Sequence, residues 1–285
     1  MGKFSQRIFE RKEWWKIDNY IYLSETDKHT ISVGFSKQDI KIHKGISGLK
    51  YYLIVMYLRK HVQTFGQVSL TLNDLLQECG YSTRTNNKSI YSDFREIIKT
   101  EIINKGYATC NADIFTVKPN DMFYLQLSYE NNVFFTNGNF VQITITEYEK
   151  ICSIKSKINN SILLGVFLYI KQFIMDYSES LSPAKISFPS KAQIAKGLDI
   201  SIPTVENSIS ILESQKIIYV RRNMFVENKN KEGIYVPTRN VYALNPKELE
   251  GDAVLIELER IYEKRIYNQK DIPGKIDYLT KQKEK

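Results

Sequence analysis

The sequence has few of the residues that build metal sites and disulfide frameworks. Of its 285 residues, three are cysteines and three are histidines. Cys79, Cys110 and Cys152 lie far apart and lack the paired short spacings that a zinc site or a disulfide framework needs. We therefore expect the cysteines to be small core residues, and we expect neither a metal ion nor another cofactor.

Long apolar stretches are missing as well. No window approaches the roughly 20 apolar residues that a membrane helix requires. The first residues, up to Trp14 and Trp15, hold no apolar stretch long enough for a signal peptide. The sequence thus predicts a cytoplasmic protein in a reducing compartment, with no membrane partner.

The motifs of several enzyme classes are also missing. His29, His43 and His61 form no His-x-His pair, on which rolling-circle nicking enzymes depend. There is no Gly-rich phosphate loop ending in Gly-Lys-Ser or Gly-Lys-Thr. The acidic residues are scattered, without the pairing that suggests glycosidase or nuclease chemistry. We therefore expect no enzymatic activity and no catalytic residues.

Positive charge is what the sequence has in excess. Forty Lys and Arg against 32 Asp and Glu give a formal net charge of +8. Such a charge favours a polyanionic partner, nucleic acid among them, without identifying it. The excess is clear in residues 1–60 and at the C-terminus, where lysine-rich ends can also serve solubility alone.

The second half of the chain has the clearer pattern of elements. The predicted order is an apolar helix over 158–177, a short strand over 186–188, a helix over 191–196 closed by Gly197, a helix capped by Ser201, and strands over 217–222 and 234–244 around a polar, basic turn. Val205, Ile209 and Leu212 fall on one face of the capped helix. This order of elements is that of a winged helix-turn-helix.

The segment from Ile194 to Val205 closely resembles the turn and second-helix start of bacterial winged-helix regulators. In that family a small residue lies inside the first helix, a capping Ser opens the recognition helix, and Thr-Val leads its buried face. The matching residues are Ala195, Ser201, Thr204, Val205, Ile209, Leu212 and Glu213.

The first half of the chain repeats this plan more loosely. It predicts an apolar helix over 49–60, a strand over 68–70, helices over 72–79 and 90–98, and strands over 107–110, 114–117 and 123–127. Ser69 and Ser187, in the two short strands, lie 118 residues apart, and the capping serines Ser82 and Ser201 lie 119 apart. This near-constant spacing suggests an internal duplication.

We therefore predict an α+β fold with two winged-helix units in tandem plus a C-terminal helix. The predicted parts are an N-terminal arm over 1–34, a first winged-helix domain over 35–138, a second, DNA-binding winged-helix domain over 139–246, and a C-terminal helix, over 253–267, with a flexible tail in 247–285. The boundary rests on the hairpin signal at Asn137-Gly138, which follows a predicted strand at Val133-Phe134-Phe135.

The exposed start of the second helix of a helix-turn-helix fits the major groove, where polar side chains meet base edges. We expect Asn207 to pair with adenine and Thr204 to reach a phosphate or a thymine methyl group. Phosphates repel Glu206 unless it accepts from a cytosine amino group. The other candidates on this helix are Ser201, Pro203 and Ser210. The alternative is an exposed helix without a ligand.

The predicted hairpin supplies the positive charge that this helix lacks. Its candidate phosphate contacts are Arg221, Arg222, Lys229, Lys231 and Arg239. In the first unit, the matching turn and helix start hold Arg84, Asn86, Asn87 and Lys88. Such polar clustering is equally typical of a solvated loop.

Tandem winged helices in a chain of this length, with a basic wing and a more apolar first unit, resemble the replication initiators of theta-replicating bacterial plasmids. In that family the first unit commonly serves dimerisation and the second reads repeated origin sequences. The resemblance implies a sequence-specific double-stranded DNA-binding protein that forms a homodimer and meets host replication proteins. Two alternatives stay open: a transcriptional regulator of a mobile element, and a replisome or segregation adaptor that acts through protein contacts.

Overall fold

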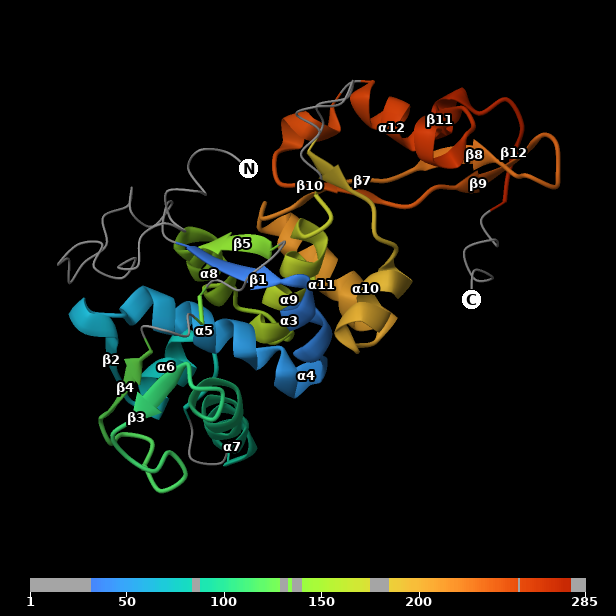
Figure 1. The fold of residues 1–285 in the computed structure, drawn as a ribbon. Coiled ribbons are helices and arrows are strands. Elements are labelled where there is room, and N and C mark those ends of the chain that lie inside the picture. Colours follow the sequence, from blue (N-terminus) through green and yellow to red (C-terminus); the bar gives the residue numbers. More distant parts are fainter. Residues whose placement is uncertain are drawn as a thin grey trace. The chain divides into compact units, whose positions relative to one another are not determined.

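The structure, a computed structural model, describes residues 32–83, 88–128, 133–134, 140–174, 185–250 and 252–277. Its contacts divide the chain into two units, Met1–Gly165 and Val166–Lys285. Figure 1 shows helices and several small sheets. The predicted α+β class is therefore confirmed, whereas residues 1–31 of the predicted N-terminal arm lie outside the described residues.

Unit 1 contains two similar strand-and-helix segments. They are β1 (Ser32–Ser36) with α3 (Lys37–Ile42), and β5 (Phe140–Thr144) with α8 (Ile145–Cys152). Each helix begins with a capping box, formed by Ser36 with Asp39 and by Thr144 with Glu147. β1 and β5 pair with each other antiparallel. β5 and α8 thus lie in unit 1, whereas the predicted second domain starts at residue 139.

The rest of unit 1 surrounds one buried helix, α5. The elements are α4 (Gly45–Gly48), α5 (Lys50–His61), η1 (Thr64–Gly66), β2 (Gln67–Leu70), α6 (Leu72–Glu78), α7 (Lys88–Ile97), η2 (Ile98–Ile103), β3 (Ala108–Cys110) and β4 (Phe123–Leu127). α5 is apolar on almost all sides, as a helix enclosed by other elements must be. Its two buried cations have partners: Lys50 pairs with Asp93 of α7, and the Arg59 guanidinium lies 5.5 Å from the Phe134 ring centroid.

Two predicted strands of this unit are turns. In residues 114–117, the backbone carbonyl of Asp113 accepts from the backbone N–H groups of Thr116 and Val117, which closes a turn in place of a strand. The described part of the predicted strand before Asn137, residues 133–134, also lies in a turn. Ile114 and Val117 in the first turn, and Val133 and Phe134 in the second, are buried without strand pairing, which explains why these segments resemble strands in the sequence.

The boundary between the units falls inside α9 (Asn160–Lys171), with residues 160–165 in unit 1 and 166–171 in unit 2. The helix is shorter than the predicted helix over 158–177. Unit 2 continues with β6 (Ile186–Ser187), α10 (Lys191–Leu198), α11 (Ile202–Ser214), β7 (Tyr219–Arg221), β8 (Met224–Glu227), β9 (Ile234–Pro237) and β10 (Val241–Ala243). β6, β10 and β7 form one sheet in that order. The hairpin is longer than predicted, because the chain turns at Asn223, with φ 58°, and goes on from β7 into β8.

The chain after β10 returns to the β8–β9 hairpin. It forms η3 (Pro246–Leu249), α12 (Ala253–Tyr262), β11 (Ile266–Asn268), η4 (Gln269–Asp271) and β12 (Lys275–Ile276). β11 pairs with β8 and β12 pairs with β9, so that the four strands have the order β11-β8-β9-β12. The sequence predicts a flexible tail after the C-terminal helix, whereas β12 is part of this sheet. The helix predicted over 253–267 ends at Tyr262, because Glu263 has a left-handed φ of 53°.

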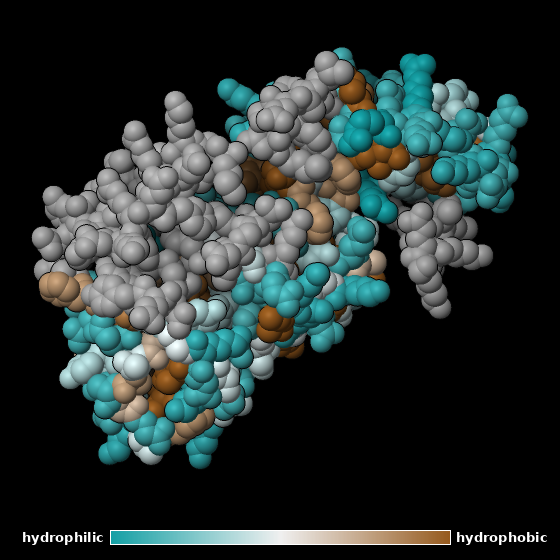
Figure 2. Space-filling view, in the orientation of Figure 1, coloured by the Kyte–Doolittle hydropathy of each residue, from teal (hydrophilic) through white to brown (hydrophobic). Residues whose placement is uncertain are grey.

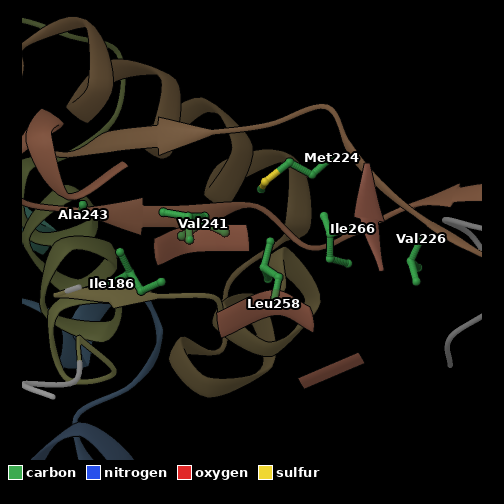
Figure 3. Close-up of a cluster of buried hydrophobic side chains, with 8 residues drawn as sticks. Ile186, Met224, Val226, Val241, Ala243, Leu258 and Ile266 are labelled. Carbon is green, nitrogen blue, oxygen red and sulfur yellow. The ribbon is translucent and has the colours of Figure 1, made fainter. Parts of the chain in front are cut away.

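A buried apolar cluster joins α12 to the strands of unit 2. Its members are Ile186, Met224, Val226, Val241, Ala243, Val254, Leu258 and Ile266. Figure 3 shows the side chains of Met224, Leu258 and Ile266 close to one another, from β8, α12 and β11. The C-terminal segment is therefore part of the fold of unit 2.

One order of elements occurs twice in the chain. In the first half it is α5, β2, α6, α7, β3, β4, with η1 and η2 as additional short helices, and in the second it is α9, β6, α10, α11, β7, β10, with β8 and β9 inserted between the last two strands. In both, the third strand lies between the other two, as β2-β4-β3 and as β6-β10-β7. The capping boxes before α3 and α8 extend the likeness to the preceding helices. This agreement supports the predicted internal duplication.

Candidate nucleic-acid interface

Most of the candidate reading residues lie in the first turns of α11. Ser201 is the cap of this helix, as the sequence predicts: its Oγ accepts from the backbone N–H of Thr204 at 3.2 Å. Pro203 lies in the first turn, where the missing N–H costs little. The hydroxyls of Ser201 and Thr204 also lie within hydrogen-bond distance, 2.8 Å apart. The start of α11 is thus fixed by local hydrogen bonds.

α10 ends later than the sequence predicts. Gly197 lies inside the helix, and Asp199, with a left-handed φ of 54°, ends it. The glycine serves packing, because a Cβ at this position would lie 2.1 Å from Cε2 of Tyr169 on α9. The prediction that Gly197 closes the helix is therefore wrong, and a glycine fits this position because two helices approach each other closely.

α11 has one buried and one exposed face. Val205, Ile209 and Leu212 are buried, as predicted. The exposed residues on the other side are Ile202, Pro203, Glu206, Asn207 and Ser210. Thr204 is half-buried. The structure thus brings the predicted reading residues together on the face that solvent reaches.

Glu206 has a cationic partner on the preceding helix. Its Oε1 lies 2.5 Å from Nζ of Lys191, the first residue of α10. Both side chains stay accessible, with exposed fractions of 49% for Glu206 and 38% for Lys191. Sequence reasoning did not find Lys191, because the two residues lie 15 positions apart on different helices.

Arg221 and Arg222 have partners within the chain. The Arg221 guanidinium donates to the Leu249 carbonyl at 3.0 Å and to Oδ1 of Asn268 at 3.3 Å. Arg222 donates two hydrogen bonds of 2.6 Å to the carboxylate of Glu213, a geometry that fixes both side chains. Both guanidinium groups therefore donate to acceptors within the chain, whereas the sequence suggests that they bind phosphate.

The tip of the β8–β9 hairpin carries two lysines, with the exposed Glu232 beside them. Lys229 and Lys231 are exposed there and form no ion pair within the described ranges. The C-terminal segment adds Lys275, whose backbone N–H donates to the Gly233 carbonyl at 2.9 Å, and Lys264, whose ammonium donates to a β8 carbonyl at 3.4 Å. Figure 2 shows hydrophilic residues gathered over this end of unit 2. The sequence did not indicate the two added lysines, because they join the hairpin only through β11 and β12.

Arg239 is exposed between β9 and β10, and its backbone N–H donates to the Tyr262 hydroxyl at 3.1 Å. In unit 1, Lys88 is exposed at the start of α7. Arg84, Asn86 and Asn87 lie outside the described residues.

The loop between β3 and β4 bends back onto the helices of unit 1. The Pro119 carbonyl accepts from the backbone N–H of Asn73 at 3.0 Å, at the start of α6. Arg95 of α7 donates to the Val117 carbonyl at 2.7 Å. The corresponding hairpin of unit 2 is instead bound by the C-terminal segment, so the two hairpins present different surfaces.

The cysteines agree only in part with the expected core positions. Cys79 is buried, with its Sγ 3.8 Å from the Tyr148 hydroxyl, and burial raises the pKa of its thiol. Cys110 and Cys152 are half-buried, and burial raises the pKa of Cys152 to about 12. Within the part of the chain that is described, no three His, Cys, Asp or Glu side chains are grouped to hold a metal ion.

No helix in the described ranges combines the length and apolar character needed to cross a membrane. No protein-family model matches the sequence, and a search of curated proteins finds no significant match.

Proposed function

We propose that this chain is a sequence-specific double-stranded DNA-binding protein made of two winged-helix units, and that it initiates replication of a plasmid or another mobile element. The repeated order of elements, with the third strand between the first two, supports the proposal, because it is the order expected of a winged helix-turn-helix. The observation that carries the proposal is the exposed polar face of α11 in the same unit as a hairpin tip whose two lysines form no ion pair with any described residue.

In the proposed complex, α11 enters the major groove and the hairpin contacts phosphates. Asn207 is exposed and meets adenine, whereas Thr204 meets a phosphate or a thymine methyl group. Lys229 and Lys231, with Arg239, neutralise phosphates and add affinity without sequence preference. Arg221 and Arg222 hold the hairpin in position through the contacts described above, which leaves phosphate binding to the two lysines and Arg239.

Unit 1 takes the dimerisation role in this proposal. Phe123 and Phe134 of this unit are buried and belong to its core. Three apolar side chains near the β3–β4 loop stay exposed, namely Phe115, Met122 and Tyr124, with exposed fractions of 48%, 62% and 42%. They support association of two chains, and light scattering that showed a monomer both free and on DNA would contradict it.

The test of DNA reading compares two residues of α11. Ser201→Ala removes a cap, and we expect it to lower stability by about 1 kcal/mol while discrimination between cognate and random duplex persists. Asn207→Ala leaves the melting temperature unchanged, because the side chain is exposed, but lowers discrimination by about 1 to 3 kcal/mol. The cognate site is first obtained by selection from random duplexes.

Three outcomes separate the candidate functions. Binding at directly repeated sites in the DNA around the gene supports an initiator. A single palindrome at a promoter identifies a transcriptional regulator instead. An absence of salt-dependent duplex binding contradicts both and favours an adaptor that acts through protein contacts.

A further inference from the structure

The ion pair between Glu206 and Lys191 lies on the face that we propose for DNA. Glu206 projects from the exposed side of α11, one position before Asn207. Its partner is the first residue of α10, and the two charged atoms are 2.5 Å apart. Glu213, toward the other end of α11, is instead bound on both carboxylate oxygens by Arg222. Of these two carboxylates, Glu206 is therefore the one near the proposed reading end of the helix.

A carboxylate at this place is unfavourable beside most DNA sequences. Phosphates repel it, and its partner Lys191 is itself attracted to phosphate. Lys191 cannot fully neutralise a phosphate and Glu206 at the same time. A duplex that draws Lys191 away therefore leaves the Glu206 carboxylate without its cation, unless a base offers a hydrogen-bond donor in its place.

Cytosine offers such a donor in the major groove. Its N4 amino group donates, and a glutamate accepts from it, whereas guanine presents only the acceptors N7 and O6 at its own edge. Adenine also has an amino group, but the neighbouring N7 acceptor repels a carboxylate. A carboxylate on the exposed face of α11 thus accepts a hydrogen bond from cytosine, whereas each of the other bases makes binding less favourable.

We infer that Glu206 is a specificity-determining residue that selects cytosine at one position of the site, and that Lys191 holds its carboxylate in place until DNA binds. The inference rests on the proposed function. It assigns to Glu206 a repulsive role against wrong sequences as well as an attractive role toward the right one.

The experiment compares sites selected from random duplexes by the full chain and by three variants. Glu206→Gln keeps the size of the side chain and removes its charge. We expect the preference for cytosine at one position to fall about 5- to 150-fold, which corresponds to about 1 to 3 kcal/mol at 1.4 kcal/mol per factor of ten. Because glutamine pairs with adenine, the preferred base should shift toward adenine. Affinity for random duplex should rise about threefold or more, since one repulsive charge is lost.

Two further variants serve as controls. Glu213→Gln removes a carboxylate from the same helix but away from its start. Because this change also weakens the pair with Arg222, the readout is the selected site and not the affinity, and the site should not change. Lys191→Gln removes the partner and leaves the carboxylate, so affinity should fall for all sequences while the cytosine preference persists. Circular dichroism melting checks that each variant folds.

Identical selected sites for the parent chain and Glu206→Gln would overturn the inference. A loss of the cytosine preference in Lys191→Gln but not in Glu206→Gln would also overturn it, because the reading group would then be the lysine. If the parent chain bound no duplex in a salt-dependent manner, the proposed function would fail instead, before any variant was compared.

Discussion

Arg221 shows how a cation on a hairpin can serve the fold. Its guanidinium is half-buried and donates to the Leu249 carbonyl and to the Asn268 side chain, both in the C-terminal segment. We expect Arg221→Ala to lower the free energy of unfolding by about 1 to 3 kcal/mol, because two acceptors lose a charged donor. Urea unfolding followed by circular dichroism measures this change.

The matched variant for Arg221→Ala is Lys229→Ala, which removes an exposed cation from the same hairpin. Its effect on unfolding should stay within about 0.5 kcal/mol. Equal stability of the two variants would show that the contacts of Arg221 do not support the fold.

His43 gives unit 1 a dependence on pH. Its ring stacks on Tyr51 with centroids 3.7 Å apart, and Nε2 lies 3.6 Å from the Glu101 carboxylate. Burial outweighs the attraction of that carboxylate and lowers the pKa of His43 from 6.5 to about 4. The unfolded chain therefore binds this proton more readily than the folded chain does.

A histidine with a lowered pKa stabilises the fold fully above its unfolded pKa. As the pH falls from 6.5 to about 4, that contribution, about 3 kcal/mol at most, is lost. We expect the free energy of unfolding of the parent chain to decrease over this window, and His43→Gln to decrease less. Urea unfolding at several pH values between about 5 and 6.5, where most carboxyl groups are still charged, tests this. Parallel pH profiles of the two proteins would refute the role of His43.

At the scale of elements, α12 is a structural part of unit 2. Leu258 is fully buried against the strands, whereas Ile256, two residues earlier on the same helix, is 57% exposed. Leu258→Ala should lower the free energy of unfolding by about 2 to 5 kcal/mol, because it leaves a cavity. Ile256→Ala is the control and should change it by less than about 0.5 kcal/mol. Similar urea midpoints for both variants would show that α12 is not part of the cooperative core.

The sequence predicted those elements whose signals are local. Ser201 as a cap and the spacing of Val205, Ile209 and Leu212 define α11, because a helix start and a buried face depend on neighbouring residues. The turn at 114–117 was mistaken for a strand, since burial of apolar residues does not depend on strand pairing. β12 was missed because it is two residues long and its partner, β9, lies far away in the sequence.

The candidate site also has features that the local sequence predicts and features that depend on contacts between distant segments. The exposed position of Asn207 follows from helix periodicity and could be predicted. The contacts of Arg221 with Leu249 and of Glu206 with Lys191 depend on how distant segments meet, and no spacing rule contains that information. The sequence therefore identified the basic residues, but it did not show which of them already bind acceptors within the chain.

For the whole molecule, the net charge of +8 attracts DNA as it would attract any polyanion. The lysines of the hairpin tip are instead proposed to contact individual phosphates. The two effects can be separated with variants of equal charge. Lys229→Gln with Lys231→Gln removes two charges from the tip, and Lys155→Gln with Lys157→Gln removes two exposed charges from unit 1. All four lysines are exposed, so that neither double variant should affect folding.

If the tip lysines neutralise phosphates, their loss releases fewer counterions on binding. The slope of log Kd against log salt concentration should then decrease by about 2 for the tip variant, with an equal loss of affinity on cognate and random duplex. The unit 1 variant should keep the parent slope, because neither of its lysines is a proposed phosphate contact and screening by salt weakens charges that make no contact. Fluorescence anisotropy at several salt concentrations measures both slopes. Equal reductions in the two variants would mean that overall charge, and not the hairpin tip, attracts DNA.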